Sequence, residues 1–197
     1  MDLLLTDARI ATMAGADYGI LEDAALAIAD GRIAWLGASG DAPQAASTRS
    51  LKGRWITPAL IDCHTHLVFA GDRSGEFEQR QRGASYEDIA RAGGGIMSTV
   101  GATRTASADE LYAAALPRIR ALLDEGVATV EIKSGYGLNI ETELKMLSVA
   151  RQLGDATPAT VRTTLLAAHT VPPEFRGNAD AYVTLICDEL LPEVAAG

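Results

Sequence analysis

The sequence predicts a mixed α/β fold in which a small β region precedes a series of parallel βα units. Two observations support this. Residues up to about 56 form short apolar segments separated by turn residues, whereas the rest alternates β-branched apolar runs with amphipathic helical patterns. We therefore divide the chain into a β domain, residues 1–56, and a βα domain, residues 57–197.

The β region is predicted from apolar segments at residues 3–13, 24–29 and 32–36. Asp30-Gly31 separates the last two, and this dipeptide favours a tight hairpin turn with positive φ. Residues 38–50 are rich in Gly, Ala and Ser and contain a proline, so we expect a surface loop there.

The βα region begins with an apolar run at residues 56–69 that carries two histidines. Further strands are predicted at residues 127–133 and 160–168, the latter ending on His169. Caps and apolar stripes predict helices at residues 85–91, from 107 to Gly126, 141–153 and 179–191. Pro117 should kink the second helix or shift its start, and Gly154 should end the third.

Composition limits the classes of function. The 197 residues are 48% hydrophobic, enough for a core, and no apolar run is long enough to cross a membrane. A formal net charge of −9 without a Lys/Arg cluster argues against nucleic acid and leaves a small molecule as the expected partner. An acidic N-terminus without a signal pattern predicts a cytoplasmic protein, in which Cys63 and Cys187 are expected to be buried free thiols.

His64 and His66 are the candidate metal ligands. Successive side chains of a strand point to opposite faces, so the two imidazoles share one face and Cys63 and Thr65 take the other. Imidazole suits zinc or ferrous iron, but neither ion is satisfied by two ligands, so further donors are needed. The alternative is a packed or hydrogen-bonded pair near a strand end.

The candidate site residues share a position relative to the predicted strands. His64 and His66, Tyr136 and His169 each lie at or just beyond the C-terminal end of a different predicted strand. In parallel βα folds, functional groups gather at these ends. Tyr136 could instead pack as a loop aromatic, and His169 could cap the last carbonyls of its strand.

Several motifs in order resemble a known family. Pro58-Ala59-Leu60-Ile61-Asp62-Cys63-His64-Thr65-His66 opens the series, and the segments 131–138 and 141–147 continue it. The chain from Pro58 onward resembles the amidohydrolase superfamily, and within it the imidazolonepropionases of histidine degradation. This resemblance implies part of a (β/α)8 TIM barrel preceded by part of a small β-sandwich.

The resemblance also implies an activity and roles. The reaction is metal-dependent hydrolysis of the cyclic amide of 4-imidazolone-5-propanoate to N-formimidoyl-L-glutamate, with one divalent ion, Zn or Fe, in a homodimeric complete enzyme. His64 and His66 would bind the metal, Arg73 the propionate, and Tyr136 and His169 the ring or product, with His169 also catalytic. Lys133 stays outside the ligand set, and Glu141, Thr142 and Glu143 are read as an acidic first helical turn.

The chain is shorter than a complete barrel, and other functions remain open. A barrel of this type takes about 250 residues, whereas only about 140 follow Pro58, so the missing ligands and a catalytic carboxylate are expected beyond Gly197. Arg73 could instead form an ion pair with Asp72 or Glu76. Two other functions remain open: another amidohydrolase acting on a cyclic amide or aminated ring, and a non-catalytic chain that binds metal or a partner.

Overall fold

The computed structural model describes residues 1–85, 87–88 and 94–196. The chain forms two compact units, Met1–Ala59 and Leu60–Gly197. Each is described by itself. Among the described residues, no helix combines the length and the apolar character needed to cross a bilayer.

The first unit is a five-stranded sheet in the order β3-β2-β1-β4, with β5 also paired to β1. β1 and β2 pair antiparallel, as do β2 and β3, whereas β4 and β5 run parallel to β1. Asp30 and Gly31 both have positive φ, 50° and 70°, so the predicted hairpin turn is confirmed. The strands are β1 (Leu3–Ala11), β2 (Ile20–Ala29), β3 (Arg32–Ala38), β4 (Ser47–Ser50) and β5 (Trp55–Ile56).

One expectation for this unit was wrong. The predicted loop at residues 38–50 contains a 3-10 turn, Ser39–Asp41, and the edge strand β4. All four residues of β4 are exposed, so no apolar alternation marks it in the sequence. The strand exists because its main chain pairs with Leu3 to Thr6 of β1.

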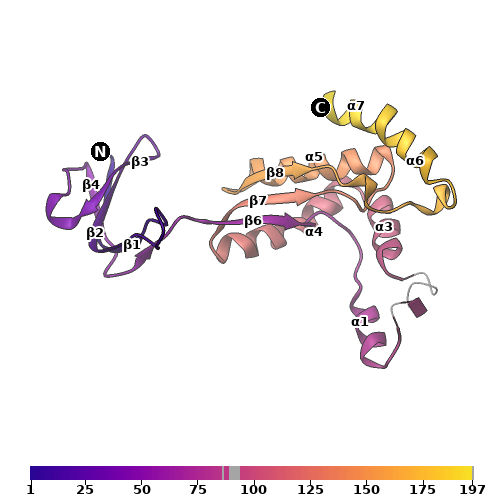
Figure 1. Ribbon diagram of the computed structural model, residues 1–197, viewed down its shortest axis with the longest axis horizontal. Helices are drawn as coiled ribbons and strands as arrows, with labels where there is room; N and C mark the ends of the chain where they lie inside the picture. The colour runs from indigo at the N-terminus through magenta and orange to yellow at the C-terminus, as the bar shows by residue number, and fades with distance from the viewer. Residues whose placement is uncertain (86, 89–93, 197) are drawn as a thin grey trace. The chain divides into compact units, whose positions relative to one another are not determined.

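The second unit is built on a parallel sheet of three strands, in the order β6-β7-β8. Figure 1 shows these strands side by side, with the helices α4 and α5 alongside them. Strand β7 has the predicted bounds. The strands are β6 (Leu60–Thr65), β7 (Val127–Lys133) and β8 (Thr160–Thr164).

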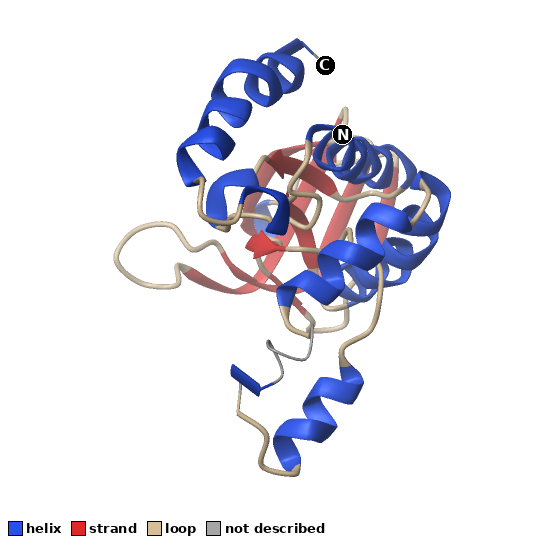
Figure 2. Cartoon of the chain, turned by 90° about the vertical axis from the view of Figure 1, so that its right-hand side faces the viewer, coloured by secondary structure: helices blue, strands red, loops and turns tan. Residues whose placement is uncertain are grey.

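The helices of this unit pack on the sheet and on each other. α4 and α5 contact one another, and they cover β7 and β8 through a core that includes Leu111, Ile119, Val130 and Leu153. The closing helical run leads to the C-terminus (Figure 2). The helices are α1 (Ser74–Gln81), α3 (Ile96–Thr105), α4 (Ala108–Asp124), α5 (Ile140–Ala156), α6 (Ala179–Leu185), a π-helical turn (Ile186–Leu190) and α7 (Leu191–Ala196).

Helix ends follow the sequence signals in part. Ser107 and Glu110 form the predicted capping box, and α4 runs through Pro117 without a shifted start. α5 was predicted to stop at Gly154 but continues to Ala156. A Cβ at Gly154 would lie 3.1 Å from the Val161 Cβ, so this glycine allows close helix–strand packing instead of ending the helix.

Other differences concern exposure and extent. β6 was predicted to be buried on both faces, but Leu60 and Ile61 are 57% and 70% exposed because β6 is an edge strand of the three-stranded sheet. The strand predicted to reach Ala168 ends at Thr164. Helix α3 was not predicted. Cys63 and Cys187 are free as expected, but both are exposed.

The helix predicted at residues 85–91 is only partly described. The Ser85 hydroxyl accepts the Asp88 backbone N–H at 3.1 Å, as a capping residue does. The rest of that helix and Gly93 lie outside the described residues. Gly95 is the residue before α3 and has a φ of 75°, a value that glycine adopts without strain.

Candidate active site at the carboxyl edge of the parallel sheet

The three parallel strands end level with one another. Thr65 of β6 pairs with Ile132 of β7, and Lys133 of β7 pairs with Thr164 of β8. The segments that follow the strands therefore start at one edge of the sheet, where candidate groups from separate strands can meet.

His64 and His66 lie together at the end of β6. Their ring centroids are 5.7 Å apart. Thr65, between them, is buried on the opposite face, and its hydroxyl donates to the Glu131 carbonyl oxygen at 2.6 Å. The two imidazoles therefore lie close together, although β6 ends at Thr65 and its pairing with β7 is irregular between Asp62 and Thr65.

The environment of His66 favours a neutral imidazole. Burial lowers its pKa, and the nearby positive charges of His64, His169 and Lys133 lower it further, against a smaller opposing effect of the Ser134 backbone. A neutral ring keeps a lone pair for coordination.

Two observations test whether these residues fit a metal ion. The Nδ1 atom of His66 is buried, and no described residue lies in hydrogen-bonding geometry with it, which is unusual for a buried polar atom and would be relieved by a bound group. Within residues 1–85, 87–88 and 94–196, however, no three His, Cys, Asp or Glu side chains converge to hold an ion. The chain therefore fits part of a metal site.

Tyr136 joins the histidines to a cavity. Its ring centroid lies 5.1 Å from that of His66 and 6.0 Å from that of Phe69. The cavity measures about 460 Å³, a size suited to a small molecule. Its lining residues are Phe69, Gly71, Asp72, Arg73, Thr99, Arg118 and Tyr136.

Arg73 lines this cavity and also forms an ion pair. Its Nε donates to a Glu76 carboxylate oxygen at 2.9 Å, and the other oxygen of Glu76 accepts the Gly95 N–H at 2.7 Å. The predicted binding role and the alternative ion pair are therefore compatible. The Glu76 contact uses Nε, so in the described part of the chain the two terminal nitrogens of Arg73 remain available to bind a ligand.

Arg118 is a cavity residue that sequence reasoning missed. Its guanidinium carbon lies 3.7 Å from the Phe69 ring centroid, and Nη1 donates to the carbonyls of Leu67 and Phe69 at 2.8 and 3.1 Å. These contacts fix the segment after the histidine pair on α4. A basic residue beside Pro117 in a helical pattern indicates only a solvent-facing side chain, so the sequence carried no signal for it.

His169 lies farther beyond its strand than predicted. It ends a 3-10 turn, Ala167–His169, and its Nε2 lies 2.6 Å from the Gly135 carbonyl oxygen. A carbonyl only accepts, so Nε2 carries the proton. In the neutral ring, Nδ1 then carries no proton and keeps its lone pair.

Glu131 and Lys133 form a second polar group beside the histidines. One Glu131 oxygen accepts from Lys133 Nζ at 2.6 Å and from the Thr164 hydroxyl at 2.5 Å. These hydrogen bonds lower the pKa of Glu131, and the charges of Lys133 and His64 add to the effect. Lys133 thus has a carboxylate partner on its own strand, and Glu131 was not predicted.

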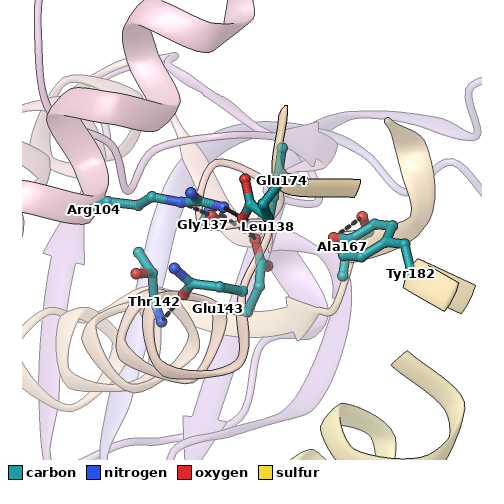
Figure 3. Close-up of polar contacts among 9 residues, drawn as sticks. Arg104, Gly137, Leu138, Thr142, Glu143, Ala167, Glu174 and Tyr182 are labelled. Carbon is teal, nitrogen blue, oxygen red and sulfur yellow. Dashed lines mark hydrogen bonds and ion pairs between the residues drawn. The ribbon is translucent and has the colours of Figure 1, made fainter. Parts of the chain in front are cut away.

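Glu143 differs most from its sequence interpretation. It was read as part of an acidic helical turn, yet it is fully buried. Its carboxylate accepts backbone N–H groups from Gly135, Gly137 and Leu138 at 2.9, 2.8 and 2.7 Å. Figure 3 shows Glu143 beside Gly137 and Leu138, with Arg104 near the same loop. The loop that carries Tyr136 therefore wraps around one carboxylate.

Comparison with known proteins identifies the relatives of this chain. No family model matches it. It is 58% identical to the imidazolonepropionase of Rhizorhabdus wittichii over 196 residues, which are 98% of this chain and 49% of that protein. It is 54% identical to the imidazolonepropionase of Pseudomonas entomophila over 198 residues, 100% of this chain and 49% of that protein. The chain is related to the imidazolonepropionases.

The imidazolonepropionase resemblance predicted from the sequence is thereby confirmed. The chain spans about half the length of the curated imidazolonepropionases it matches. Another imidazolonepropionase, from Ralstonia nicotianae, is 58% identical over 200 residues, 99% of this chain and 49% of that protein.

Solved structures confirm a mixed α/β fold shared with amidohydrolases. 5-Methylcytosine deaminase from Klebsiella pneumoniae matches with a TM-score of 0.60 and 19% identity, over 94% of this chain and 41% of that one. Atrazine chlorohydrolase from Arthrobacter aurescens, solved with zinc and atraton, matches with a TM-score of 0.56 and 16% identity, over 82% and 35%. A protein described as an amidohydrolase matches at 0.51 and 18% identity, over 83% and 31%. At these identities the likeness concerns the fold alone.

Proposed function

We propose that the whole protein hydrolyses the cyclic amide C–N bond of 4-imidazolone-5-propanoate to give N-formimidoyl-L-glutamate. One observation carries this proposal. In a chain related to imidazolonepropionases, the His64–His66 pair lies beside Tyr136, and Tyr136 and Arg73 line the same cavity. This chain would supply part of the metal site and part of the substrate pocket.

In this proposal, His64 and His66 hold one divalent ion, Zn or Fe. Two imidazoles do not complete the coordination of either ion, so the other ligands would lie in the half of the relatives' length that this chain does not span. Such an ion, when bound, polarises a carbonyl group and lowers the pKa of a water molecule toward ~7.

The cavity residues of this chain would bind the substrate. The terminal nitrogens of Arg73 offer a planar pair of donors to the propionate, while Nε stays with Glu76. Tyr136 offers its ring face and hydroxyl to the imidazolone ring. His169 would contact the ring and transfer a proton through Nδ1, because its Nε2 is engaged by Gly135.

The same relationship supports a proposal for the architecture. Three parallel strands with crossover helices would be the first units of a (β/α)8 barrel, residues 57–197, preceded by part of a β-sandwich, residues 1–56. We further infer a cytoplasmic homodimer acting on a small molecule, from the resemblance to imidazolonepropionases.

An activity assay with metal analysis tests the proposal. The protein, at the full length of its relatives, is incubated with 4-imidazolone-5-propanoate and formation of N-formimidoyl-L-glutamate is followed. We expect turnover together with about one equivalent of Zn or Fe. Turnover of other cyclic amides or aminated rings but not of this substrate would overturn it, as would absence of all hydrolysis from metal-loaded protein.

A further inference from the structure

We propose that Glu143 is a positioning residue: its buried carboxylate fixes the Gly135–Leu138 loop so that Tyr136 faces the site and the Gly135 carbonyl holds His169. The functional meaning of Tyr136 and His169 rests on the proposed function, whereas the positioning itself does not. Three features of the loop carry the inference.

The first feature is the placement of Glu143. A carboxylate removed from water is costly unless hydrogen bonds satisfy its charge. One Glu143 oxygen accepts from Gly135 at 2.9 Å, and the other accepts from Gly137 and Leu138 at 2.8 and 2.7 Å. Glu141, on the same helical turn, is exposed, so the helix start alone does not require a buried acid.

The second feature is the backbone of the loop. Leu138 has a φ of +56° and is fully buried, a left-handed conformation that is uncommon for a residue other than glycine. Such a conformation persists where surrounding contacts impose it, and these residues cluster at functional sites. Here the Leu138 N–H is held by Glu143, while its side chain packs in a core with Tyr182 and Ile186.

The third feature is the space that the glycines provide. A Cβ at Gly135 would lie 2.9 Å from both His169 Nε2 and the Leu166 carbonyl oxygen. A Cβ at Gly137 would lie 2.7 Å from the Glu143 nitrogen. The loop is thus pressed against the His169 turn on one side and against α5 on the other.

Gly135 connects these contacts. Its N–H donates to Glu143 and its carbonyl accepts from His169 Nε2, so one peptide segment links the carboxylate to the histidine. Arg104 holds the far end of the loop, donating from Nε to the Gly137 carbonyl at 2.6 Å while it pairs with Glu174 (Figure 3). Releasing Glu143 should therefore loosen Gly135 and, through it, His169.

Amide hydrogen exchange and imidazole ¹⁵N NMR on this chain test the proposal without substrate. In Glu143→Gln, the side-chain amide has one oxygen and an NH₂ group, and the NH₂ cannot accept from the loop. We expect at least one of the Gly135, Gly137 and Leu138 amides to exchange about 10-fold faster, on the order of the loss of one charge-assisted hydrogen bond. The His169 resonances should move toward tautomer averaging, while Val130 and Ile132 in β7 keep their protection.

Two further variants complete the test. Glu141→Gln removes the same charge from an exposed position of the same turn and should change none of these readings. Glu143→Asp keeps the charge but shortens the reach, so it should also release the loop while the core stays folded.

Unchanged loop exchange and unchanged His169 signals in both Glu143 variants would overturn the proposal. A uniform loss of protection that includes β7 in both would also overturn it, because Glu143 would then serve overall stability. Since neither reading depends on turnover, a failed hydrolysis assay would leave them intact.

Discussion

The Nε2 atom of His169 lies 2.6 Å from the carbonyl oxygen of Gly135. A side chain that follows β8 is therefore oriented by the main chain that follows β7. The contact brings His169 to the loop that presents Tyr136, whose ring centroid is 5.1 Å from that of His66. The ends of all three parallel strands thus contribute to one region.

Removing His66 should remove the metal. In the full-length protein, His66→Ala is expected to abolish retention of Zn or Fe together with hydrolysis, because one imidazole cannot replace the pair. Metal content after gel filtration, measured by elemental analysis, checks this. Cys63→Ser is the matched control, since Cys63 is exposed on the same strand. Stoichiometric metal in His66→Ala would refute the ligand assignment.

Removing the guanidinium of Arg73 should weaken substrate binding. We expect Arg73→Ala to raise KM about 10- to 100-fold with a smaller change in kcat, the range for losing a charge-assisted hydrogen bond to a carboxylate. Steady-state kinetics checks this. Arg82→Ala, which removes an exposed arginine paired with Glu78, should leave KM unchanged. An unaltered KM in Arg73→Ala would mean that the propionate is held elsewhere.

Tyr182 should make stability depend on alkaline pH. Its hydroxyl donates to the Ala167 carbonyl at 3.0 Å, and burial, with the charges of Glu143 and Glu174, raises its pKa to about 12, against an opposing effect of Arg104. The folded state holds this proton more tightly than the unfolded chain. The contribution is therefore complete below the ordinary tyrosine pKa near 10 and is lost as pH rises toward 12.

Tyr182→Phe tests that contribution. Chemical denaturation at neutral pH should show a loss of about 1 kcal/mol, because the Ala167 carbonyl loses its donor. Between pH 10 and 12, the stability of the variant should fall less steeply than that of the parent chain. Parallel curves in that interval would contradict the assigned pKa.

Gly154→Val should destabilise the second unit. The Cβ position already lies 3.1 Å from Val161 Cβ, so the added methyl groups would push α5 away from β8. We expect a loss of about 1–3 kcal/mol, as overpacking of this kind costs, measured by urea denaturation. Gln152→Val places the same side chain on an exposed position of α5 and should cost much less. Valine is a better helix former than glycine, so helix propensity alone would not produce a loss at Gly154. A loss in Gly154→Val no larger than that in Gln152→Val would contradict the packing role of Gly154.

Local signals predicted much of this architecture. The β-branched run 127–133 defined β7 to the residue, the Ser107/Glu110 pair defined the start of α4, and Asp30-Gly31 defined a hairpin. The cap and the turn depend on contacts within a few residues, and β7 is marked by its own β-branched composition although its partners are distant. The spacing of His64 and His66 likewise predicted two rings that lie close together.

The rest depends on contacts that sequence periodicity does not record. β4 exists through pairing with β1, more than 40 residues away, and has no apolar face of its own. Arg118 reaches the carbonyls of Leu67 and Phe69 from a helix whose pattern marks it as solvent-facing. Glu143 looks like its exposed neighbour Glu141 until the loop folds over it.

The short sequence distance between Glu143 and its loop bears on how the site assembles during folding. The three hydrogen bonds span only five to eight residues, so closing this loop costs little chain entropy, and the corner around Tyr136 can organise as soon as α5 begins to form. The link from Thr65 to Glu131 spans 66 residues and that from Arg118 to Leu67 spans 51. The histidine pair should therefore reach its position late in folding, after the loop around Tyr136 has formed.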